Sequence, residues 1–176
     1  SYYFTTTNAR VGRLVHSIKN QYTRWAVAGI SLGILIFVFP PLYGEGYGIF
    51  HHFMTGDVQA VFDNSGFYSF RENEWIVVGY MVAVMFVKVV AMAVTNSSGG
   101  VGGTFAPSLF VGAFLGAITA YVANTFFGAD LSIAAFSLVG MAGLMSGVMK
   151  APLTAVFLIA EISSAYQLFV PLMLVS

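Results

Sequence analysis

The sequence has no cysteine and very little charge. Without cysteine there is no disulfide framework, no thiolate zinc site and no cysteine nucleophile. Charged residues make up only 8% of the 176 residues, and hydrophobic residues make up 58%. Soluble domains carry about a quarter of their residues as charges, because a water-facing surface needs them. The composition therefore indicates an integral membrane protein.

The few charges that are present balance one another. Seven Lys and Arg stand against seven Asp and Glu, so no overall basic field would attract nucleic acid. No serine lies in a Gly-x-Ser-x-Gly pattern, and no pair of carboxylates has a catalytic setting. The adjacent His51 and His52 cannot both face one metal on regular structure, and we expect them in a solvated external loop. We expect no enzyme activity, no metal site, no cofactor and no nucleic-acid partner.

Long apolar runs divide the chain into full-length and half-length segments. A helix needs about 20 residues to cross the hydrocarbon core of a bilayer. Runs of about that length occupy residues 25–42, 75–95, 105–127 and 131–149, and shorter runs occupy 152–162 and 166–175. Discontinuous helices that end near the bilayer midplane are typical of transporters and channels. We therefore predict an all-α integral membrane fold, multi-spanning, with broken and re-entrant helices.

Two further patterns concern orientation and packing. Four basic residues precede the first run: Arg10, Arg13, Lys19 and Arg24. The charged residues between positions 43 and 74 are mainly acidic. By the positive-inside rule, the basic block is cytoplasmic and residues 43–74 lie outside.

Three pairs of glycines are spaced four apart, which favours close helix packing over a direct functional role: Gly29 and Gly33, Gly112 and Gly116, and Gly143 and Gly147.

A glycine-rich stretch separates the second and third long runs. Residues 96–108 read NSSGGVGGTFAPS, and four glycines in five positions do not form a stable helix. The next helix therefore begins inside the protein, where its first N–H groups lack intrahelical partners and its macrodipole is positive. Pro107 fits there because its missing N–H is not needed. The pattern predicts an anion site whose backbone donors belong to Gly103, Thr104, Phe105 and Ala106.

Other uses of this stretch fit less well. A phosphate-binding P-loop needs a lysine before its Ser or Thr, but Thr104 directly follows Gly103. A dinucleotide-binding fingerprint needs a preceding strand and a different glycine spacing. A flexible turn between two spans remains the alternative. Partial backbone charges would hold an anion and still release it, which conduction requires.

Two blocks of the sequence resemble the voltage-gated chloride channel (CLC) family. Residues 97–107, SSGGVGGTFAP, resemble its second-half filter motif, to which Gly102 and Pro107 belong. Residues 149–161, MKAPLTAVFLIAE, resemble its Arg/Lys-Ala-Pro-Leu-Thr stretch and the short helix after it. Residues 24–47 resemble the span that precedes this filter. The blocks follow the family's order over nearly the whole chain.

The resemblance implies both an architecture and a function. Residues 1–176 would be the second-half portion of an inverted-repeat membrane domain, whose first half and final helix lie outside this chain. The implied protein is a homodimer with an interface at about residues 152–162 and 166–176, in the plasma membrane. It would transport chloride or a related anion, as a channel or as a chloride/proton antiporter. A non-conducting membrane scaffold or sensor that keeps the fold is the alternative.

Two charges fall within apolar segments. Lys88 is the one charge of the second run, and such a charge is costly unless it pairs with a buried carboxylate or with carbonyl groups. Glu161 could relay protons in an exchanger, but it is more typical of a structural carboxylate near the interface, where it is a candidate partner for Lys88 in a buried charge pair. Lys150, at a helix end, suits a capping role.

Overall fold

The computed structural model describes residues 2–44, 46–63, 65–66, 68, 73–100 and 102–176, and its regular elements there are all helical. The α-helices are α1 (Tyr2–His16), α2 (Gln21–Val38), α3 (Tyr47–Met54), α4 (Glu74–Ser98), α5 (Phe105–Phe127), α6 (Ile133–Met149), α7 (Pro152–Ser163) and α8 (Phe169–Val175). The 3₁₀ turns are η1 (Pro40–Leu42), η2 (Gln59–Phe62) and η4 (Tyr166–Leu168). Of the described helices, α2, α4 and α5 are long and apolar enough to cross a membrane. The prediction of an all-α, membrane-embedded fold is confirmed.

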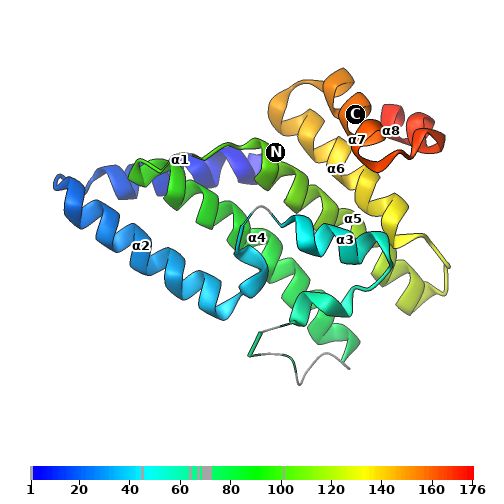
Figure 1. Cartoon of the computed structure of the whole chain (residues 1–176), viewed down its shortest axis with the longest axis horizontal. Coiled ribbons are helices and arrows are strands. Elements are labelled where there is room, and N and C mark those ends of the chain that lie inside the picture. Colours follow the sequence, from blue (N-terminus) through cyan, green and yellow to red (C-terminus); the bar gives the residue numbers. More distant parts are fainter. Residues whose placement is uncertain (1, 45, 64, 67, 69–72, 101) are drawn as a thin grey trace.

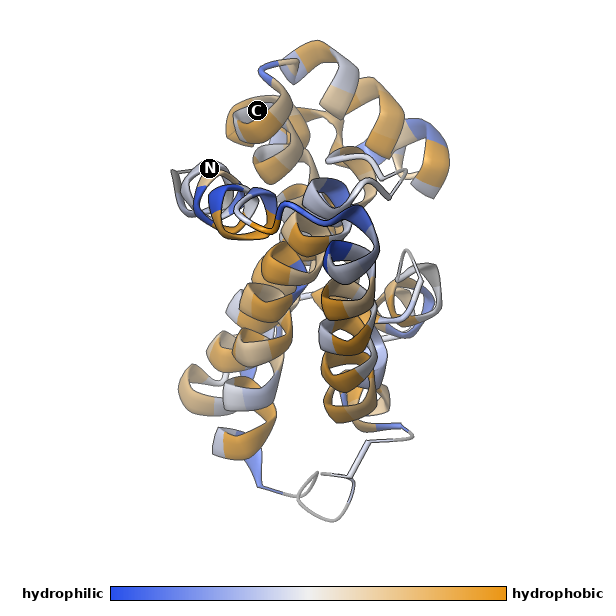
Figure 2. Cartoon of the chain, turned by 90° about the vertical axis from the view of Figure 1, so that its left-hand side faces the viewer, coloured by the Kyte–Doolittle hydropathy of each residue, from blue (hydrophilic) through white to orange (hydrophobic). Residues whose placement is uncertain are grey.

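Helix α4 lies at the centre of the arrangement. It contacts α1, α2 and α5, whereas α6 contacts α5, α7 and α8 (Figure 1). Helices α1 and α2 meet at one end of the molecule, and α6, α7 and α8 gather at the other. Figure 2 shows hydrophobic residues along the long helices and hydrophilic ones mainly toward their ends. This distribution suits helices whose middle parts lie in hydrocarbon.

Polar side chains set where the long helices begin. The Asn73 side chain accepts a hydrogen bond from the Trp75 N–H at 3.2 Å, which caps α4. Asn20 caps α2 and Ser132 caps α6 in the same manner. Each cap supplies an acceptor to one N–H that lacks a partner within its own helix. The caps therefore fix the helix starts that the apolar runs alone place only roughly.

Helices α5 and α6 pack through their backbones. A Cβ atom added at Gly112 would lie 2.5 Å from the carbonyl oxygen of Gly140, and one added at Gly116 would collide with the carbonyl oxygen of Phe136. The packing role predicted for Gly112 and Gly116 is confirmed. A Cβ at Gly29 or Gly33 would meet no described residue within 4 Å, so the packing expected of that pair stays a prediction.

Between α2 and α4, the described helix α3 packs onto α5 and α6. Phe53 of α3 is fully buried, and its ring meets Phe114 of α5 edge-on at 5.0 Å. Val61 and Phe62 of η2 are also fully buried. This burial explains why the predicted loop around the two adjacent histidines is wrong: they lie on α3, a helix held by its apolar face.

Candidate functional site

The glycine-rich break lies so close to the end of α4 that larger side chains would collide with the helix there. Helix α4 ends at Ser98 and is capped by Gly99, whose φ of +98° is the left-handed conformation that glycine adopts without strain. The N–H of Gly100 then donates to the Thr95 carbonyl at 3.0 Å, which closes the end of the helix. A Cβ at Gly102 would collide with the amide oxygen of Asn96. Gly100 and Gly102 therefore lie close against the last turn of α4.

A cavity of about 470 Å³ opens at the start of α5. Its walls come from α2, the turn after α2, α4 and the first turn of α5. The expected site residues on its wall are Lys88, Gly102, Gly103, Phe105, Ala106 and Pro107. Thr104 is not on this wall, and its hydroxyl lies 3.5 Å from the sulfur of Met149 on α6. The structure thus brings most of the glycine-rich motif and one lysine to a single cavity.

The first turn of α5 has unsatisfied backbone donors at this cavity. The first helical hydrogen bond runs from the Ser108 N–H to the Thr104 carbonyl at 3.1 Å. The N–H groups of Phe105 and Ala106 precede it and have no carbonyl within the helix to donate to. Thr104 contributes no side-chain cap, and Pro107 carries no N–H. The positive end of the α5 dipole therefore faces the cavity.

Lys88 lies on the wall of the same cavity. Its side chain is only 6% exposed. The ammonium donates hydrogen bonds to the carbonyl oxygens of Leu42 at 2.9 Å and Gly44 at 2.7 Å, and it lies 4.7 Å from the centre of the Phe110 ring. Carbonyl partners for this buried lysine were among the expectations, and they are confirmed. Through them, α4 holds the turn that follows α2.

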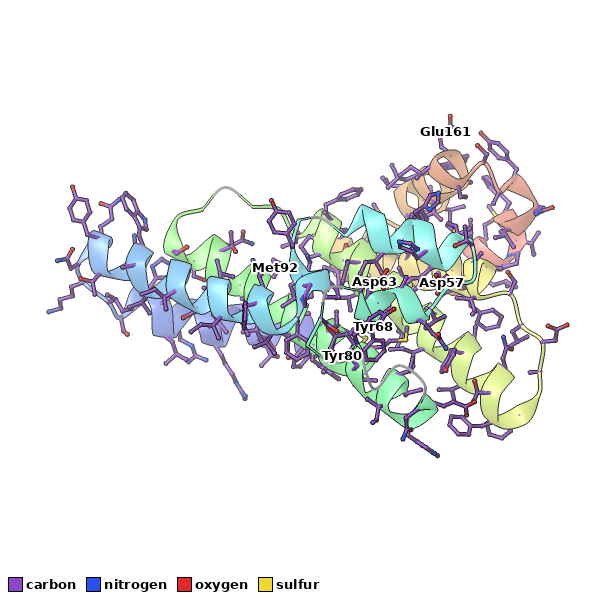
Figure 3. The ribbon with its side chains drawn as sticks, turned by 60° about the horizontal axis from the view of Figure 1, so that its bottom comes forward. Asp57, Asp63, Tyr68, Tyr80, Met92 and Glu161 are labelled. Carbon is purple, nitrogen blue, oxygen red and sulfur yellow. The ribbon has the colours of Figure 1, made fainter. Side chains whose placement is uncertain are left out.

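The expected buried charge pair with Glu161 is wrong. Glu161 is exposed on α7, and its carboxylate accepts a hydrogen bond from the Tyr166 hydroxyl at 2.6 Å. Figure 3 shows it at the outer edge of the molecule, well separated from Met92 on the cavity wall. The reason is geometric: α7 packs on α6 and α8, and α4 is not among its main neighbours.

All of residues 1–176 match the family described as "Voltage gated chloride channel". The chain belongs to the voltage-gated chloride channel family.

One curated relative in this family is named "Putative chloride channel protein ClcB-like", from Ralstonia nicotianae. It is 31% identical over 156 residues, which cover 88% of this chain and 32% of the relative. The chain therefore spans about a third of the length of that relative.

Part of the cavity wall was not predicted from the sequence, namely Leu42, Gly44 and Asn96. Asn96 lies two turns after Lys88 on α4, and its buried amide oxygen has no hydrogen-bond partner among the described residues. Leu42 and Gly44 also line the cavity, and they precede Lys88 by more than 40 positions in the sequence. The spacing of Lys88 and Asn96 was the available signal, because residues eight apart share a helix face. No pattern indicated the turn after α2.

The chemistry that this cavity offers is binding. Its polar side chains are those of Lys88, Thr95 and Asn96, the first turn of α5 adds backbone N–H groups, and the other side chains on the wall are apolar. Within the described part of the chain, no three His, Asp or Glu side chains come together as a metal site would need. The groups present suit a small anion that has shed some of its water.

Proposed function

We propose that this chain is part of a membrane protein that transports chloride or a related anion. In this proposal, the cavity at the start of α5 belongs to the anion pathway. The observation that carries it is the break between α4 and α5, which leaves a helix N-terminus open to a cavity of about 470 Å³. Membership of the voltage-gated chloride channel family and the printed name of the Ralstonia relative support the same function.

The donors proposed for the anion are the backbone N–H groups from Gly103 to Ala106. Each is a partial charge, so together they replace part of the hydration shell without trapping the ion. Gly103, Phe105 and Ala106 lie on the cavity wall, which supports their part in the site. For Thr104 only the backbone is proposed, because its side chain turns toward Met149.

The proposed assembly is a homodimer in the plasma membrane. The α7 and α8 region presents a set of exposed apolar side chains that a second copy of the chain would cover: Leu153, Phe157, Ile162, Tyr166, Val170, Met173 and Leu174. Large exposed apolar patches mark protein or membrane contacts. The resemblance to the family's interface helices favours the protein contact.

The test is an anion flux assay on the full-length protein. Purified protein is reconstituted into liposomes loaded with chloride, and we expect chloride efflux when a gradient is applied. Proton movement measured in the same vesicles separates two forms of the proposal: coupled protons indicate an antiporter, and chloride movement alone indicates a channel. Folded, reconstituted protein that moves neither chloride nor nitrate would contradict transport and favour the scaffold or sensor.

A further inference from the structure

The corner where α1 turns into α2 carries four cations: Arg10, Arg13, Lys19 and Arg24. We call these residues the basic corner. Residues 1–44 contain no Asp or Glu, so nothing in this part of the sequence neutralises them. Three of the four side chains are exposed, and that of Arg24 is half-buried. Figure 1 shows the corner at the end of the molecule opposite α6, α7 and α8.

Aromatic residues place the basic corner at the edge of the membrane. Tyr22 and Trp25 lie in the first turns of α2, are 77% and 48% exposed, and meet edge-on at 5.8 Å. Farther along α2 the exposed side chains are aliphatic or aromatic, such as Phe37, which is 86% exposed. Tyr and Trp gather at the headgroup level of membrane proteins, where an apolar body meets water. The four cations therefore lie at headgroup depth or just outside it.

Arg24 has an unused donor at this depth. Its Nε is buried, and it has no hydrogen-bond partner among the described residues. Arg13 makes one long side-chain bond, from Nε to the Ala9 carbonyl at 3.4 Å. A buried donor without an acceptor is costly, and the planar guanidinium group matches two oxygens of a phosphate. The basic corner therefore offers hydrogen-bond donors and positive charge, and residues 1–44 contain no carboxylate that could accept from those donors.

We propose that the basic corner binds the phosphate headgroups of anionic phospholipids in the cytoplasmic leaflet. The arginines supply forked donors, and Lys19 adds charge beside them. The site is connected to the rest of the protein: a Cβ at Gly12 of α1 would lie 3.4 Å from the Ser97 hydroxyl, near the end of α4. A lipid held at the corner would therefore stabilise the packing of α1 against the helix that leads into the glycine-rich break. This inference holds whether or not the protein transports anions.

The test titrates detergent-solubilised full-length protein with short-chain phosphatidylglycerol and follows its thermal unfolding midpoint. We expect the midpoint to rise with phosphatidylglycerol but not with the matching phosphatidylcholine. Each basic residue near an anionic lipid surface strengthens binding about fivefold. The double variant Arg10→Gln/Arg13→Gln is thus expected to need about 25-fold more phosphatidylglycerol for the same half-effect. Lys150→Gln removes an exposed cation outside the basic corner and is expected to match the wild type.

Three results would overturn the proposal. Equal shifts with both lipids would show that headgroup charge is not recognised. Loss of the shift in Lys150→Gln as large as in the double variant would show a general charge effect. An equal shift with inorganic phosphate would show an anion site without lipid specificity. If the double variant does not fold, Arg10→Gln alone is used, and it is expected to need about fivefold more phosphatidylglycerol for the same half-effect. The comparison of phosphatidylglycerol with phosphatidylcholine on the wild-type protein then decides whether the headgroup charge is recognised.

Discussion

Full-length protein carrying Lys88→Met is expected to lose about 3 kcal/mol of stability. The substitution keeps the length of the side chain but removes two charge-assisted hydrogen bonds, to the carbonyls of Leu42 and Gly44. Each such bond contributes roughly 1.5–3 kcal/mol, and the relief of burying an ammonium offsets part of the loss. The thermal unfolding midpoint of the purified protein measures the change. Chloride affinity is expected to fall as well, because the turn on the cavity wall loses its tether.

Lys150→Met is the matched control for this experiment. It removes another lysine, but this one is exposed at the end of α6. Substitutions at exposed positions usually change stability by less than about 0.5 kcal/mol. If Lys88→Met is as stable as this control, the two hydrogen bonds do not hold the turn.

Gly116→Ala is expected to destabilise the protein by about 2–3 kcal/mol. The added methyl group would collide with the Phe136 carbonyl oxygen, and it would lie 2.8 Å from the Cα of Ser137. Both obstacles are backbone atoms, so no side chain can rotate away, and α5 must shift from α6. The expected readout is a lower unfolding midpoint and a smaller monodisperse fraction in size-exclusion chromatography.

Gly29→Ala is the same substitution in open space. None of the described residues lies within 4 Å of a Cβ at that position, and alanine favours helix over glycine. We expect an unchanged or slightly raised unfolding midpoint. Equal losses in the two alanine variants would contradict the backbone contact between α5 and α6.

Much of the fold could be predicted from apolar runs and glycine chemistry. The run at residues 105–127 is α5 with the same bounds, because a glycine break and Gly128 delimit it. The run at 25–42 differs from α2 at both ends: the helix begins earlier, at Gln21, and it ends at Val38, since the residue before Pro40 does not stay helical. Helices α1 and α3 were missed, because α1 is too polar to form an apolar run and α3 has only eight residues. Their helical form depends on tertiary packing.

The candidate site, like the fold, could be predicted from the sequence only in part. The break before α5 follows from local physics, since glycine destabilises a helix and the next helix must start with free N–H groups. The partners of Lys88 do not follow, because contacts between distant segments depend on how the helices cross. The glycine pairs show the same limit: four-residue spacing describes Gly29 and Gly33 as well as Gly112 and Gly116, but among the described residues a helix meets only the second of these two pairs. Spacing identifies a face, and tertiary structure decides what covers it.

The most direct test of the anion site replaces one backbone amide by an ester. Lactic acid in place of Ala106 removes the N–H on the cavity wall and keeps the methyl side chain. A hydrogen bond to a charged group contributes roughly 1.5–3 kcal/mol, so we expect chloride affinity in the full-length protein to fall about 10- to 100-fold. The same exchange at Ala134, the second residue of α6, removes an equivalent helix-start N–H away from the cavity and is expected to leave the affinity unchanged. Unchanged chloride affinity in the Ala106 ester, or an equal loss in both proteins, would contradict an anion site at the start of α5.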